Sequence, residues 1–267
     1  MDSLTDPAGG AAARDAHLQY LLGLADNALV LGQRLAQWCG HAPVLEEELA
    51  LTNISLDLIG QARLLLAHAG ELEGQGRDED ALAFLRDEPA FRNWTLMELP
   101  NGKGPHEDYA VTIVRNFLAG SLQVPLWEAL AHSRDPQLAA IAARAVKEAR
   151  AHLRHATGWM IRLGDGTELS RARMQAALDA LWPYTHEFWA EGAIEQAVIA
   201  DGIGASTAAL RPAWEAQVEA VIARATLRRP ADSAFLSSGR QGRHSEHLGY
   251  LLAEMQSLAR AHPGARW

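Results

Sequence analysis

Four polar or small residues recur along the apolar segment 51–63 (LTNISLDLIGQAR) at a spacing that suits a helix. Asn53, Asp57, Gly60 and Gln61 fall within one arc of about 100°, between leucine and isoleucine side chains. A carboxylate among apolar side chains is costly to bury unless it is paired. The stripe therefore predicts a hydrogen-bond network, a metal site or an interface.

A second polar group lies on the segment 135–163. Glu148, His152 and His155 stand at positions i, i+4 and i+7 of the expected helix and share one face. These residue types could bind one metal ion, but three ligands from one helix do not close a coordination sphere. The pattern favours a hydrogen-bonded layer that faces Asp57 across a helical bundle.

The ligand set of a dinuclear iron centre is absent from the sequence. A helical bundle that binds two irons uses a glutamate from each of two helices and a Glu-x-x-His pair from each of the other two. No glutamate here is followed three residues later by histidine, and the segment 15–39 contains no glutamate. Nucleophile elbows and phosphate-binding glycine loops are also missing.

A basic strip lies on the same segment as the histidines. Lys147, Arg150 and Arg154 share one helix face, with Arg144 beside them. A solvated face is the favoured interpretation, and an anionic partner is the alternative. The run 244–247 (HSEH) mixes ligand types, but adjacent helical residues diverge, so we expect it on the surface at a helix start.

Composition narrows the classes of function. The 267 residues carry a net charge of −9, which argues against a nucleic-acid partner. A single cysteine, Cys39, excludes an internal disulfide and suits a reducing cytoplasm. No apolar run approaches the roughly 20 residues of a membrane helix. Residues 1–13 are small and polar, and we expect a disordered tail there and no signal peptide.

Helical periodicity dominates, so the sequence predicts an all-α chain whose residues 14–267 form a single ferritin-like domain. The expected core helices form two antiparallel hairpins, joined by a long crossover over 70–105 that holds a short helix near 78–86. Asp135 and Pro136 should start the fourth helix. The core helices are expected at 15–39, 43–69, 107–131 and 135–163, and accessory helices at 170–200, 205–228 and 241–261.

Several long motifs, in order, resemble one family. They are 23–35 (GLADNALVLGQRL), 51–63, 92–100 (RNWTLMELP), 108–117 and 147–163 (KEARAHLRHATGWMIRL). Over residues 15–260 the chain resembles the PaaC family, the ferritin-like structural subunits of bacterial phenylacetyl-CoA epoxidases.

The resemblance implies a non-catalytic subunit of a multicomponent oxygenase of aerobic phenylacetate breakdown. A related catalytic subunit, PaaA, would carry the di-iron centre and bind the CoA thioester, and a reductase with FAD and an iron-sulfur cluster would supply electrons from NADPH. This chain would hold no cofactor and form a homodimer when alone. Asn53, Asp57, Gln61, Glu148, His152 and His155 would replace the metal with hydrogen bonds that link the four helices.

Two other interpretations stay open at this stage. One is a stand-alone ferritin-like metalloenzyme that uses Glu148, His152 and His155 with Asp57. The other is a helical protein that binds a small molecule in a pocket of the bundle.

Overall fold

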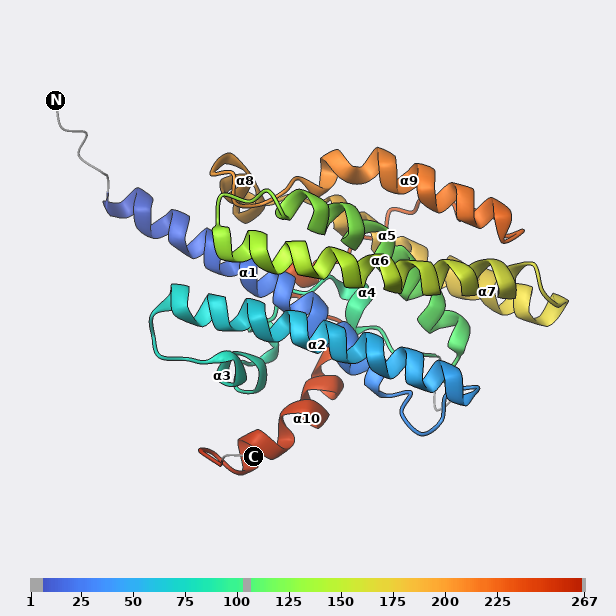
Figure 1. Cartoon of the computed structure of the whole chain (residues 1–267), viewed down its shortest axis with the longest axis horizontal. Coiled ribbons are helices and arrows are strands. Elements are labelled where there is room, and N and C mark those ends of the chain that lie inside the picture. The colour runs from blue at the N-terminus through green and yellow to red at the C-terminus, as the bar shows by residue number, and fades with distance from the viewer. Residues whose placement is uncertain (1–6, 103–106, 266–267) are drawn as a thin grey trace.

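The fold is all-α, as a computed structural model of the chain shows for residues 7–102 and 107–265 (Figure 1). These residues contain no β-strand, and only an isolated bridge joins Ser238 to Arg243. The prediction of an all-α, ferritin-like fold is confirmed.

Two long helical hairpins form the bundle. Helix α1 (Pro7–Ala36) packs along α2 (Leu45–Glu73), and α5 (Tyr109–Leu130) packs along α6 (Pro136–Gly164) (Figure 1). Gly32 lets the first pair approach closely, since a Cβ there would lie 3.1 Å from Ile59. The hydroxyl of Ser55 donates to the carbonyl oxygen of Gly32 at 2.8 Å at the same crossing.

The described part of the crossover between the hairpins contains three short helices, and the first of them was expected. They are α3 (Glu79–Phe84), η1 (Glu88–Ala90) and α4 (Thr95–Glu98). Asp78 caps α3 by accepting a hydrogen bond from the backbone N–H of Ala81.

The first helix begins earlier than expected. Residues 7–13, assigned to a disordered tail, belong to α1; residues 1–6 lie outside the described part of the chain. Pro7 suits the first helical position, and alanines follow at 11–13, which favour helix more than any other residue. Arg14 then fixes this turn by donating to the carbonyl oxygen of Leu72, at 2.8 Å from its Nε.

Residues 170–200, expected as one helix, form three segments. Helix α7 (Glu168–Leu181) is followed by the 3₁₀ segment η2 (Trp182–Trp189) and by α8 (Ala193–Ala200). Pro183 removes a backbone donor and ends α7, and Gly192 precedes α8. The last elements are α9 (Thr207–Arg224), η3 (Gly239–Gln241) and α10 (Glu246–Ala261).

These accessory elements pack against the bundle and against the crossover. Helices α7 and α9 pack against α5 and α6, α8 packs against α1, and α10 packs against α3 and α4. By length and composition alone, α2 could span a membrane, and it is the one helix in the described ranges that could. The core helix of a helical bundle has the same length and composition, and α2 packs along α1 as such a helix does.

Candidate functional site

A layer of paired polar side chains joins α2 to α6. His152 and Asp57 form a hydrogen bond of 2.9 Å between Nε2 and Oδ2. One helical turn away, the amide of Gln61 donates to the carboxylate of Glu148 at 2.9 Å. The spacing of four residues on each helix places both pairs on facing sides, so the two antiparallel helices meet through them.

Glu47 completes the polar layer, and sequence reasoning missed it. Its carboxylate lies 2.7 Å from Nε2 of His155 and also accepts a hydrogen bond from the hydroxyl of Tyr109 on α5. Glu47 stands in register with the buried residues Leu51 and Leu58. That periodicity was the available signal, but the favourable effect of acidic residues near a helix start explains Glu47 equally well.

Two expectations about the α2 stripe are wrong. Asn53 is exposed and does not belong to the layer, and the side chain of Asp57 is 43% exposed at the edge of the bundle. The buried face of α2 runs instead through Leu51, Ile54 and Leu58. Because this face is rotated away from the expected one, the carboxylate of Asp57 keeps contact with water.

The polar layer joins three helices and not the expected four. Its contacts connect α2 with α6 and, through Glu47 and Tyr109, with α5. On α1 the buried acid Asp26 is bound elsewhere, in an ion pair with Arg86 of the crossover. Among the described contacts of the layer, α1 therefore contributes no carboxylate.

Burial sets the protonation of two groups in the layer, His152 and Tyr109. It lowers the pKa of His152, and the opposing influence of Asp57 does not restore the usual value. The neutral ring therefore donates its Nε2 proton to the carboxylate. Burial also raises the pKa of Tyr109, and the neighbouring Glu47 raises it further, so this hydroxyl stays protonated and donates.

The polar layer does not fit a dinuclear iron centre. Such a centre draws carboxylates from four helices and a Glu-x-x-His pair from two of them. Here each of Glu47, Asp57 and Glu148 is matched to a histidine or amide partner. These hydrogen bonds occupy carboxylate oxygens that a metal ion would otherwise use as ligands.

The basic strip on α6 faces solvent. Lys147, Arg150 and Arg154 are all exposed, and Arg150 lies 2.6 Å from Glu128 in a surface ion pair. Exposed pairs of this kind contribute little to stability. The strip remains available to an anionic partner, as the sequence allowed.

The expectation for the run 244–247 is wrong in part. The imidazole of His244 is buried, 2.8 Å from the carboxylate of Glu98, and its Nε2 lies 3.1 Å from the carbonyl oxygen of Phe91. The hydrogen-bonding groups that hold it lie in the crossover, more than a hundred residues away along the chain. Spacing within the run carries no sign of this contact.

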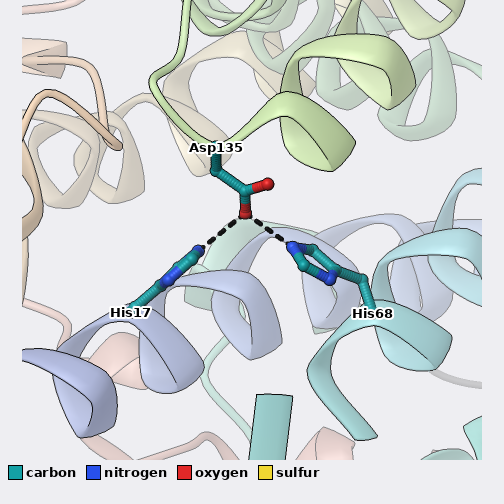
Figure 2. A group of neighbouring side chains, drawn as sticks. All are labelled: His17, His68 and Asp135. Carbon is teal, nitrogen blue, oxygen red and sulfur yellow. Dashed lines mark hydrogen bonds and ion pairs between the residues drawn. The ribbon is translucent and has the colours of Figure 1, made fainter. Parts of the chain in front are cut away.

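A second polar cluster lies at one end of the bundle, and no sequence pattern predicted it. Asp135 caps α6 as expected, by accepting hydrogen bonds from the backbone N–H groups of Gln137 and Leu138 through Oδ1. Its other carboxylate oxygen, Oδ2, contacts the imidazoles of His17 on α1 and His68 on α2 (Figure 2).

Comparison with known proteins identifies the family. The family model described as "Phenylacetic acid catabolic protein" matches residues 5–267. The chain is also 52% identical over 248 residues to a subunit of the 1,2-phenylacetyl-CoA epoxidase of Escherichia coli (strain K12), and the match covers 93% of this chain and 98% of that relative. With this match along nearly the whole length of both proteins, the chain belongs to the phenylacetic acid catabolic protein family.

Proposed function

We propose that this chain is the structural subunit of a phenylacetyl-CoA epoxidase, a multicomponent oxygenase of aerobic phenylacetate breakdown. The observation that carries the proposal is the identity of 52% to a subunit of such an epoxidase across 98% of that protein. In this role the chain pairs with a related di-iron subunit, PaaA, which binds the CoA thioester and performs the epoxidation. Both subunits would act in the cytoplasm, supplied with electrons by an NADPH-dependent reductase.

The non-catalytic role rests on the chemistry of the polar layer. The carboxylates of Asp57, Glu148 and Glu47 already accept hydrogen bonds from neighbouring side chains. If these carboxylates bound a metal ion instead, all of these hydrogen bonds would have to break. The layer instead ties α2 to α5 and α6, which keeps the bundle rigid without a metal.

The exposed face of α2 is the surface that we assign to the catalytic subunit. Leu45, Leu49, Leu56 and Leu64 are all exposed there, and a Cβ added at Gly60 between them would meet nothing within 4 Å. Several large apolar side chains exposed on one face of a helix are typical of a protein contact. We call these four leucines the α2 outer face, and we expect the same face to join two copies when the catalytic subunit is absent.

Reconstitution tests this assignment. A tagged form of this chain is co-expressed with the catalytic subunit of the same operon, and epoxidation of phenylacetyl-CoA is measured with the reductase added. The proposal predicts a stable complex that is active, a catalytic subunit with little activity alone, and no activity from this chain alone. A catalytic subunit that is equally stable and active without this chain would overturn it.

A further inference from the structure

Two histidines and an aspartate converge at the end of the bundle where α6 begins. His17 comes from α1, His68 from the last turns of α2 and Asp135 from the N-terminal cap of α6 (Figure 2). The Nε2 atoms of the two rings lie 2.8 Å and 2.5 Å from the same oxygen, Oδ2 of Asp135. We call these three residues the end triad.

The geometry points to a divalent metal site: we propose that the end triad binds one Zn²⁺ or a similar late first-row cation. Two imidazoles and one carboxylate are the ligand set of a mononuclear site with an open position. In the described part of the chain, this is the one group of three histidine, cysteine or acidic side chains whose ligand atoms lie close enough, all within 4.8 Å of one another. The inference does not depend on the proposed function.

The distances suit metal entry with little rearrangement. Zinc at about 2.0–2.1 Å from each ligand separates tetrahedral ligand atoms by about 3.3 Å. To reach that spacing, each Nε2 atom has to move away from Oδ2 by less than about 1 Å. Both Nε2 atoms already face the same oxygen (Figure 2), and the rings meet edge to face with centroids 5.9 Å apart.

The burial of the end triad favours a bound cation over a solvated cluster. The side chains of His17, His68 and Asp135 are only 13%, 12% and 7% exposed. Nε2 of each ring faces the carboxylate, whereas Nδ1 of His68 is buried without a hydrogen-bond partner and would keep its proton in a metal-bound state. A cation between these three part-buried ligands would balance the charge of the carboxylate.

The open coordination position would face a surface pocket. An open surface pocket of about 530 Å³ borders the end triad and is also lined by Arg134, Asp201 and Ile203. The guanidinium of Arg134 donates to the carbonyl oxygen of Asp201 at 3.1 Å on the rim. Water or a carboxylate oxygen of a small anion would suit the fourth position, because Arg134 and the cation both favour negative charge.

The chain also allows a sharp set of variants. Asp135→Asn keeps the cap of α6, since asparagine caps a helix as well as aspartate does, but it removes the anionic ligand. His17→Gln and His68→Gln each remove one imidazole. His152→Gln is the matched control, because that histidine is equally buried on α6 but belongs to the polar layer.

Titration of the chelator-treated full chain with Zn²⁺ alone, and with Co²⁺ as a spectroscopic probe, tests the site. We expect one equivalent of Zn²⁺, a rise in Tm, and the visible bands of four-coordinate Co²⁺. His17→Gln, His68→Gln and Asp135→Asn should each weaken binding by about 100-fold or more, while His152→Gln should leave it unchanged.

Two outcomes would overturn the assignment. One is the absence of saturable binding of either cation by the wild-type chain. The other is one equivalent of binding that survives in Asp135→Asn and His68→Gln, or that is lost in His152→Gln. Circular dichroism of each variant confirms that it keeps its helix content, and if a histidine variant does not fold, Asp135→Asn alone decides the question.

Discussion

Nε2 of His152 lies 2.9 Å from Oδ2 of Asp57, so α6 and α2 meet through a neutral imidazole and a carboxylate. In a bundle that binds two irons, carboxylates and histidines of facing helices are metal ligands. The carboxylate of Asp57 gives the buried ring of His152 a hydrogen-bond partner without any cation. This contact agrees with the structural role proposed for the chain.

Removing this pair should cost moderate stability. His152→Ala deletes a ring that is 8% exposed and one hydrogen bond, whereas Asp57 regains water at the edge. We expect a loss of about 1–3 kcal/mol in the free energy of unfolding, measured with urea. Asn53→Ala on the exposed side of α2 serves as the control and should change stability by less than about 0.5 kcal/mol.

Loss of the ion pair between Asp26 and Arg86 should lower the free energy of unfolding more than loss of the His152 pair does. Both side chains are buried, and the carboxylate also accepts a hydrogen bond from the backbone N–H of Arg92 at 2.8 Å. Asp26→Ala leaves the guanidinium buried and unpaired, which should cost about 3–5 kcal/mol in urea unfolding. Arg150→Ala breaks the exposed pair with Glu128 and should cost less than about 1 kcal/mol. Equal losses in both variants would contradict this ranking.

Stability should depend on pH through His244. Burial disfavours the charged ring, but the hydrogen bond and the charge of Glu98 outweigh burial and raise the pKa of His244. The folded chain then holds the proton more tightly than the unfolded chain. The contribution is complete below the unfolded value of about 6.5 and is lost as the pH rises through the folded pKa.

Urea unfolding from about pH 6 to about pH 8.5 checks this sign. The stability advantage of the wild-type chain over His244→Gln should shrink as the pH rises. An advantage that grows with pH would show that the pKa of His244 is lowered in the folded chain.

The α2 outer face predicts a selective loss of assembly. Leu49→Glu combined with Leu56→Glu adds two charges to side chains that are 56% and 60% exposed, so the fold should tolerate them. Association with the catalytic subunit should weaken more than about tenfold, since charges buried at an interface lose their hydration. Leu169→Glu on α7, where the leucine is 65% exposed, is the matched control. Equal affinity of the double variant and the control would place the partner on another surface.

Local signals explain which parts of the fold could be predicted. Aspartate followed by proline is a local signal for a helix start, and α6 begins at Pro136 after the cap Asp135. The crossover was predicted from its composition, and Asp78 caps α3 within it. The break in 170–200 was missed because the apolar periodicity continues through Pro183, although the backbone of α7 does not.

Contacts between distant segments could not be predicted. His17 and Asp135 are separated by 118 positions, and His68 and Asp135 by 67, so no spacing rule brings them together. On α2 the sequence predicted the wrong buried face of the helix. Asn53 and Leu51 are close in sequence, but only packing against α1 decides which of them is buried.

Iron analysis of the two separated subunits tests the central claim most directly. The complex is purified after co-expression in iron-rich medium, once with the wild-type chain and once with Asp135→Asn. Metal that is lost in Asp135→Asn is then assigned to the end triad. We predict dinuclear iron in the catalytic subunit and no dinuclear iron in this chain in either form. Iron in equal amounts in the two subunits, unchanged by Asp135→Asn, would contradict the structural role.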